Sequence, residues 1–120
     1  MIDDKGRMWF GENRSDRIGM FDLNTRTFRE WTPPTPGALP YDVTSDRLGR
    51  VWVGGEYDDR ILRLDPATGA FVQYLLPNFT NVRRVFVDNK PATPVFWVGN
   101  NHAATIVRLE PLDAARVAAR

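Results

Sequence analysis

Hydrophobic residues fall in short runs along this 120-residue chain, and a few polar or turn-forming residues follow each run. Apolar runs of this length, bounded by glycine, proline, aspartate and asparagine, are typical of β-strands joined by tight turns. The pattern is clearest in residues 46–77, which read DRLGRVWVGG, then DRILRLDPATG, then AFVQYLLP. Three strands are predicted within that stretch.

The same pattern occurs nearly three times. Trp9, Trp52 and Trp97 lie 43 and 45 residues apart. Three further positions keep the same spacing: Gly11, Gly54 and Gly99; Ile18, Ile61 and Ile106; and Asp22, Asp65 and Glu110. A period in the low forties made of short strands is typical of a β-propeller, because one such unit does not bury its own faces. An all-β fold of four-stranded antiparallel blades is therefore predicted, with the recurring tryptophans packed between blades.

About ten strands are expected from this pattern. They cover residues 8–11, 17–22, 27–32, 41–44, 51–54, 60–65, 70–76, 84–88, 96–99 and 105–110. Grouped into blades, they give three, four and three strands, so the chain begins on the second strand of one blade. Residues 1–111 are thus expected to form a partial propeller, with repeats at about 3–45, 46–87 and 88–111.

Two and a half blades are too few to close a ring, since closed propellers have typically four to eight. Three explanations stay open: the end of a longer propeller, an assembly of copies, or an open array. Exposed sheet edges pair readily with other chains, so self-association through the open blade edges is one expectation. The tail, residues 112–120, is rich in alanine and arginine and could form a turn or two of helix.

Turn chemistry explains the recurring acidic residues better than an active site does. The turn at 65–69 reads DPATG, in which Asp65 can accept backbone hydrogen bonds and Gly69 can adopt positive φ. Arg26 takes the place of Gly69 in the first repeat. If this position needs positive φ, either the arginine costs about 1 kcal/mol or the turn changes type.

Composition and charge exclude several classes of protein. Sixteen lysines and arginines balance fifteen acids, and the arginines are scattered, so neither nucleic acid nor an anionic membrane is an expected partner. Cysteine is absent, which excludes disulfides and thiolate metal sites but leaves the compartment open. No apolar run approaches the roughly 20 residues that span a bilayer. A soluble chain without a secretory signal of its own is predicted.

The motifs WFGE, RIGMFD, FREWTPPTPG and DPATG resemble the repeats of the streptogramin (virginiamycin B) lyase family over about residues 3–111. The resemblance implies a propeller of the type found in the family's seven-bladed namesake. That enzyme linearises cyclic streptogramin antibiotics by elimination across an ester linkage, with Mg²⁺ and a histidine general base. The resemblance also implies that relatives are often exported.

The catalytic residues of that family do not carry over directly. Its histidines often lie in PHG-type segments that lead into the innermost strands, whereas residues 39–43 and 82–86 read LPYDV and VRRVF. Glu12 occupies the position of the family's WFTE glutamate, and its counterparts are Gly55 and Asn100. Two functions stay open: a lyase-like segment for metal-assisted elimination, or a non-catalytic module that binds a small molecule or a protein.

Four residues lie in equivalent loops and are expected to line one rim of the propeller: Glu12, Glu56, Asn100 and His102. As the only histidine, His102 is the candidate base or ligand, although an ordinary loop residue is the alternative. Asp42 and Arg83, near the start of innermost strands, are candidates for ligand binding at the channel mouth, because arginine suits anionic or carbonyl-bearing ligands. Solvated loops and salt bridges are the alternatives for these residues.

Overall fold

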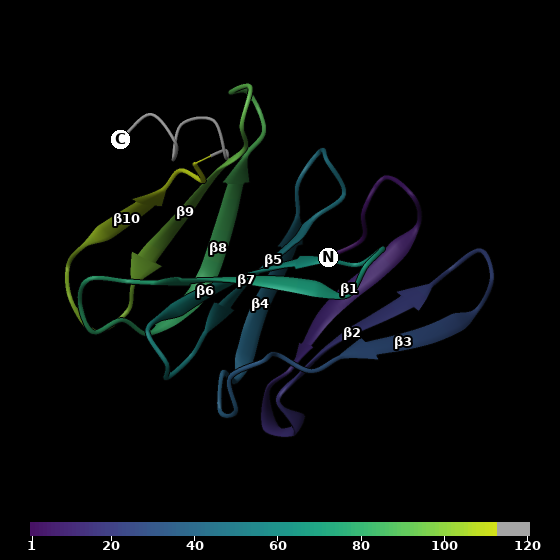
Figure 1. The fold of residues 1–120 in the computed structure, drawn as a ribbon, viewed down its shortest axis with the longest axis horizontal. Coiled ribbons are helices and arrows are strands. Elements are labelled where there is room, and N and C mark those ends of the chain that lie inside the picture. The colour runs from purple at the N-terminus through teal and green to yellow at the C-terminus, as the bar shows by residue number, and fades with distance from the viewer. Residues whose placement is uncertain (113–120) are drawn as a thin grey trace.

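The computed structural model describes residues 1–112 and shows ten strands in three antiparallel sheets over that range (Figure 1). The first sheet holds β1 (Arg7–Glu12), β2 (Arg17–Asp22) and β3 (Thr27–Trp31). The second holds β4 (Pro40–Ser45), β5 (Val51–Gly55), β6 (Arg60–Asp65) and β7 (Ala70–Leu75). The third holds β8 (Val82–Asp88), β9 (Val95–Asn100) and β10 (Ile106–Leu109). The predicted three, four and three strands are confirmed.

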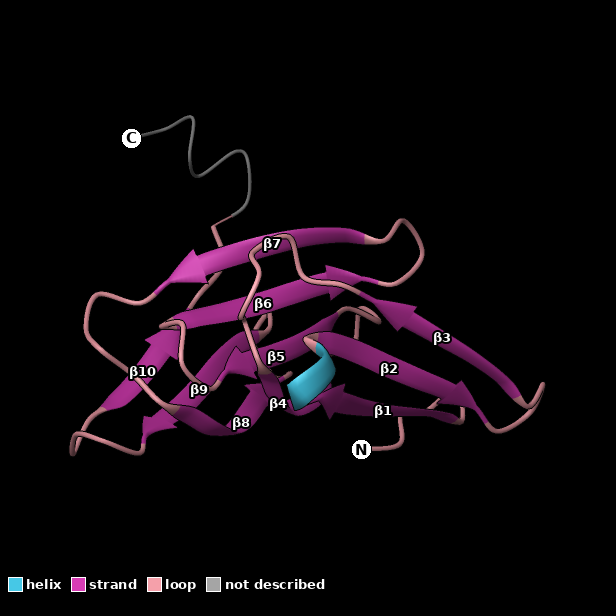
Figure 2. Ribbon diagram, turned by 90° about the horizontal axis from the view of Figure 1, so that it is seen from below, coloured by secondary structure: helices cyan, strands magenta, loops and turns pink. Residues whose placement is uncertain are grey.

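The three sheets fan out side by side, and we call them the first, second and third blades (Figure 1). Strand β4 lies next to both β1 and β8, so these three strands form the inner side of the fan. One 3₁₀ turn, Asn13–Ser15, joins β1 to β2 (Figure 2). The predicted all-β partial propeller is confirmed. The turn or two of helix expected in residues 112–120 lies, apart from Leu112, outside the described residues. No helix in residues 1–112 is long and apolar enough to cross a membrane.

Equivalent turns keep one backbone conformation despite different residues. Arg26 has φ 57° and Gly69 has φ 76°. Their backbone amides donate to the carbonyl oxygens of Asp22 and Asp65 respectively, both at 2.8 Å. The first repeat therefore keeps the left-handed turn with arginine in place, at a cost of about 1 kcal/mol.

Two hydrophobic clusters fill the spaces between blades. The first is built largely from Trp9, Ile18 and Trp31 of the first blade and from Val51, Val53, Leu62 and Leu64 of the second. The second cluster includes Trp52 and Ile61 of the second blade and Phe96 and Val98 of the third. Strand β5 is buried along its whole length because both its faces are covered. Its continuous apolar sequence follows from that position.

In the first two blades, the aspartate that begins the turn before the tryptophan-bearing strand also binds that tryptophan. These turns are residues 3–7 and 46–50. The Asp46 carboxylate accepts hydrogen bonds from Trp52 Nε1 at 2.8 Å and from Arg50 Nε at 2.7 Å. The Arg50 guanidinium lies 5.8 Å from the centre of the Trp52 ring. Asp3 makes the same two side-chain contacts in the first blade. These aspartates therefore satisfy buried indole N–H groups as well as shaping turns.

Asp3 makes the stability of the fold depend on pH. Burial acts to raise the pKa of Asp3, but hydrogen bonds from Trp9, Arg7 and Lys5 outweigh it and lower the pKa below its ordinary value. A carboxyl group with a depressed folded-state pKa stabilises the fold above its unfolded pKa, and this contribution is lost as the pH falls through the folded value.

We therefore expect Asp3→Asn to reduce the loss of stability on acidification. Urea unfolding at about pH 7 and about pH 2.5 gives the two free energies to compare. The exposed neighbour Asp4, as Asp4→Asn, is the control and should keep the acid sensitivity of the parent chain. An Asp3→Asn variant that loses as much stability on acidification as the parent contradicts this prediction.

Candidate functional site

Polar side chains gather at one end of the three blades, where the β1–β2, β5–β6 and β9–β10 connections meet. Glu56, in the β5–β6 connection, is 8% exposed and lies at the centre of this group. Its Oε2 accepts a hydrogen bond from Asn13 Nδ2 at 3.0 Å, and its Oε1 lies 3.4 Å from Arg83 Nη2. One carboxylate therefore joins residues from all three blades.

Asn81 holds the arginine of this group in place. Asn81 Nδ2 donates to the Glu56 carbonyl oxygen at 2.7 Å, and Asn81 Oδ1 accepts from Arg83 Nε at 2.9 Å. The Arg83 side chain is 45% exposed, so its anchored guanidinium also faces solvent. It lies 6.0 Å from the centre of the Tyr41 ring. Arg83 is thus a fixed, accessible donor for an anionic or carbonyl-bearing ligand.

Asn100 connects the third blade to the same group. Its Oδ1 accepts from the backbone amides of His102 at 3.0 Å and Asn81 at 3.4 Å, while its Nδ2 donates to the Phe79 carbonyl oxygen at 2.8 Å. We call the five side chains of this hydrogen-bonded group the rim network: Asn13, Glu56, Asn81, Arg83 and Asn100. Three of the predicted site residues are thus close to one another: Glu56, Arg83 and Asn100.

His102 lies beside the rim network but is exposed. Its ring meets Phe79 edge-on, with ring centres 6.0 Å apart. Within residues 1–112, no hydrogen bond or ion pair holds the imidazole. A histidine base is normally oriented by a partner on its second ring nitrogen. No side chain in residues 1–112 orients the His102 imidazole in this way.

Besides His102, two predicted site residues lie outside the rim network. Asp42 Oδ2 accepts from the Val85 amide at 3.0 Å, so Asp42 ties β4 to β8 on the inner side of the fan. The Glu12 carboxylate lies over Gly19. Burial and then the neighbouring Glu30 charge raise the pKa of Glu12, and the charge of Arg17 partly offsets them. Glu12 is therefore placed on the first blade, apart from Glu56.

The sequence interpretation did not select Asn13 and Asn81. Asn13 lies 43 residues before Glu56, which is the repeat period, so applying that offset to Glu56 would have found it. Asn81 lies in the connection before β8, where the repeats differ in length, and no sequence pattern marks it. Asp58, in the loop of Glu56, was also missed. Burial raises the pKa of Asp58, against hydrogen bonds and charge from Arg60.

The metal implied by the resemblance does not fit these residues. Among residues 1–112, no group of three or more histidine, aspartate or glutamate side chains gathers to hold a metal ion. Magnesium is usually held through carboxylate oxygens. The Glu56 carboxylate instead meets an amide nitrogen and a guanidinium.

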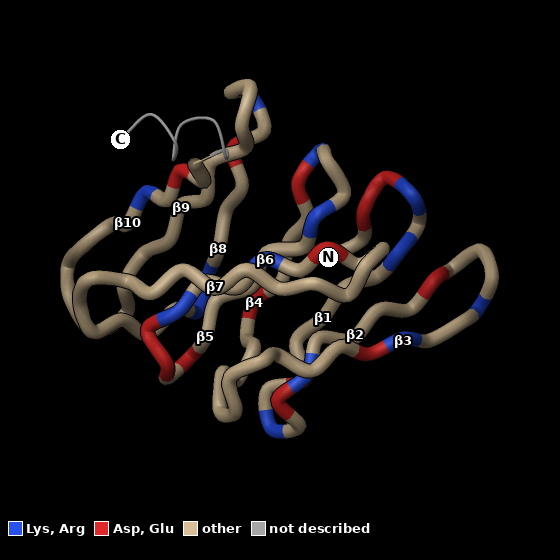
Figure 3. Tube along the Cα trace, viewed as in Figure 1, with Lys and Arg blue, Asp and Glu red and all other residues tan. Residues whose placement is uncertain are grey.

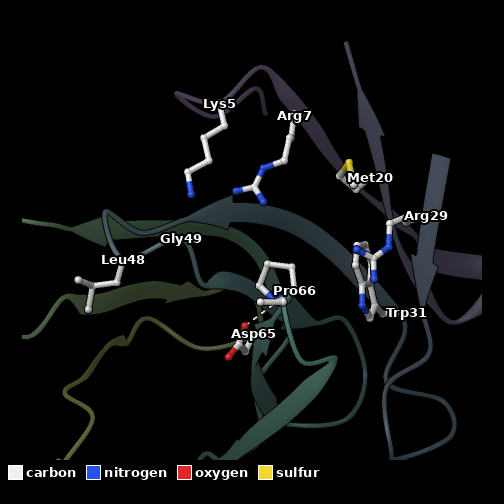
Figure 4. Close-up of a pocket in the computed structure, with 10 residues that line it drawn as sticks. Lys5, Arg7, Met20, Arg29, Trp31, Leu48, Gly49, Asp65 and Pro66 are labelled. Atoms are coloured by element: carbon white, nitrogen blue, oxygen red, sulfur yellow. Dashed lines mark hydrogen bonds between the residues drawn. The ribbon is translucent and has the colours of Figure 1, made fainter. Parts of the chain in front are cut away.

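A groove of about 250 Å³ lies at the opposite end of the blades, between the first and second. The Lys5 and Arg7 side chains extend into it, and Arg29 stacks on Trp31 with 4.8 Å between the guanidinium carbon and the ring centre (Figure 4). Asp65 is the acidic residue among those that line it. None of the predicted site residues lines this groove.

Across the described chain, acidic and basic segments alternate along the turns (Figure 3).

Comparison with known proteins gives a structural likeness only. No family model and no curated protein matches the chain. A catalytically inactive histidine-to-alanine variant of virginiamycin B lyase from Staphylococcus aureus, solved with quinupristin, matches at a TM-score of 0.72 and 25% identity. That match covers 96% of this chain and 41% of the other. This chain resembles virginiamycin B lyase.

Two further structures match the chain, the first a lyase and the second a likeness of fold alone. A streptogramin B lyase structure matches at a TM-score of 0.67 and 25% identity, over 97% of this chain and 41% of the other. The extracellular domain of a protein assigned as a one-component system from B. thetaiotaomicron matches at 0.56 and 15% identity, over 91% of this chain and 16% of the other. The chain thus spans about two fifths of the length of the virginiamycin B lyases it resembles.

Proposed function

We propose that this chain is a ligand-binding segment of a virginiamycin B lyase-like propeller, and that its rim network binds a carbonyl-rich, ester-linked ligand of the streptogramin B type. The observation that supports this proposal is the position of the Arg83 side chain. Its guanidinium is anchored by Glu56 and Asn81 and remains 45% exposed. A donor fixed in this way loses little side-chain entropy when it binds a carbonyl oxygen.

The likeness to a lyase solved with quinupristin supports this choice of ligand. Residues 1–112 hold neither an oriented histidine nor a carboxylate group suited to Mg²⁺, which favours binding over catalysis by these residues alone. Propellers host both binding and enzymatic functions, so the proposal depends on the residues of the rim and not on the fold.

Calorimetric titration with quinupristin tests the proposal. Arg83→Ala should weaken binding by about 10-fold or more, because one anchored charged hydrogen bond is worth about 1.5–3 kcal/mol. Arg84→Ala is the matched control, since Arg84 is the exposed neighbour and makes no hydrogen bond or ion pair with the described residues. Equal affinities for the two variants, or no binding by the parent chain, would contradict the proposal.

Elimination at an ester-linked substrate is the second candidate, and His102 is the residue that would support it. The lyase with quinupristin is inactive as a histidine-to-alanine variant, and His102 is the one histidine here. In such an elimination, His102 would accept a proton from the carbon adjacent to the one that bears the ester oxygen. The C–O bond then breaks, a double bond forms between the two carbons, and the carboxylate leaves. Incubation with quinupristin and Mg²⁺ should then give an opened product with the parent chain and none with His102→Ala. Equal lack of turnover in both would remove this candidate.

A further inference from the structure

The two junctions between blades use the same positions of the repeat. At the first, the face of the first blade that carries Trp9 and Ile18 packs on the face of the second blade that carries Val51 and Val53. At the second, shifted by one repeat, the face with Trp52 and Ile61 packs on the face with Phe96 and Val98. Each blade therefore has two different faces. The tryptophan-type face carries the recurring tryptophan and isoleucine, and the receiving face packs against the tryptophan-type face of a neighbouring blade.

The tryptophan-type face of the third blade has no partner within residues 1–112. Trp97 lies on it and Ile106, the equivalent of Ile61, is 77% exposed. A shallow apolar groove of about 280 Å³ lies there, lined in part by Phe86, Trp97 and Ile106. A Cβ atom at Gly99 would meet nothing within 4 Å.

The receiving face of the first blade is also uncovered within the described residues. Its apolar side chains occupy the repeat positions of Val51, Val53, Leu64 and Phe71, and they are Met8, Phe10, Phe21 and Phe28. Phe28 is 52% exposed, and its ring centre lies 5.8 Å from that of Phe10. The equivalent side chains of the second blade belong to or pack against the buried first cluster.

Charge also distinguishes the two uncovered faces. Glu12, Arg17 and Glu30 lie near one another on the receiving face of the first blade, and Arg17 pairs with Glu30 at 3.1 Å, so the three side chains carry a net negative charge. Arg84 is among the residues that line the groove on the third blade. Opposite charges on two apolar surfaces favour pairing between those surfaces over pairing of either surface with itself.

We propose that the uncovered face of the third blade binds the uncovered face of the first blade of a second copy, in a head-to-tail contact that repeats the internal junctions. The occupant is a copy of this chain because its first blade presents the residue types that cover Trp9 and Trp52 inside the chain. Two copies joined at both contacts contain six sheets, which lies within the range of four to eight blades found in closed propellers.

The mass in solution and two charge variants test this contact. Multi-angle light scattering of the 120-residue chain should give about twice its 13.7 kDa mass. Ile106→Glu and Phe28→Glu each place a charge at the contact and should weaken association by about 100-fold or more. Both residues are exposed in the single chain, and circular dichroism melting checks that each variant folds. Leu75→Glu is the matched control, because Leu75 is 70% exposed on the second blade, whose faces are already covered.

A mixture of the two variants separates head-to-tail pairing from other arrangements. The Ile106→Glu chain keeps a normal first blade and the Phe28→Glu chain keeps a normal third blade, so the mixture should regain a dimer through one intact contact. A monomeric parent chain, a dimer unaffected by Phe28→Glu, or a mixture that stays monomeric would each overturn the proposal.

Discussion

Replacing Asp46 by alanine is expected to lower the free energy of unfolding by about 3 kcal/mol or more. The Asp46 side chain is fully buried and accepts hydrogen bonds from Arg50, Trp52 and the backbone amide of Leu48. Without the carboxylate, the Arg50 guanidinium loses its ion-pair partner and the Trp52 indole N–H stays buried without an acceptor. Both losses fall at the centre of the second blade.

Asp65→Ala is the matched control for Asp46→Ala. Asp65 is a turn aspartate at the end of strand β6. Unlike Asp46, its side chain accepts a single backbone hydrogen bond, from Ala67 at 2.9 Å, in an exposed turn. Its loss should cost about 0.5–1.5 kcal/mol. Equilibrium urea unfolding gives both values. Similar costs for the two substitutions would show that the Asp46 contacts with Arg50 and Trp52 add little to stability.

Gly11→Ala is expected to destabilise the fold by about 2–3 kcal/mol, whereas Gly99→Ala at the equivalent position should leave stability unchanged or raise it. A Cβ atom at Gly11 would lie 2.5 Å from the carbonyl oxygen of Pro40, in the backbone of the next blade. The backbone there does not move aside as a flexible side chain would. At Gly99 the same atom meets nothing within 4 Å.

Thermal unfolding of the two glycine variants at low protein concentration measures this difference. The comparison is matched because both glycines occupy the same position of the repeat and neither has positive φ. Equal destabilisation by the two alanines would mean that the third blade is covered on its outer face, or that Gly11 does not approach Pro40 as closely as described.

The repeat period made most of the fold predictable. A spacing of 43 residues between Trp9 and Trp52 fixes where each strand, turn and core position recurs, since every blade is held by the same contacts. The period placed Arg26 at the position of Gly69 and left two possibilities, a left-handed residue or a turn of another type. Its φ of 57° shows the left-handed residue. Local propensity disfavours arginine there, but the repeated turn overrides it.

The rim was less predictable because its contacts join loops that differ between repeats. Glu56 bonds to Asn13 across one period, but the two residue types differ, so sequence similarity did not pair them. Glu12 matches the family motif, yet its side chain lies over Gly19, where the absence of a side chain leaves room for it. The hydrogen bond from Trp52 to Asp46 is not predictable from the repeat, because it joins two side chains whose contact is visible only in three dimensions.

Mapping quinupristin binding onto individual backbone amides by NMR tests the proposed rim function most directly. Chemical-shift changes are expected at the amides of Asn13, Glu56 and Arg83 as quinupristin is added, with little change at Lys5 and Gly49 beside the groove at the opposite end of the blades. Changes confined to the groove of Lys5 and Gly49, or no changes at saturating quinupristin, would contradict it.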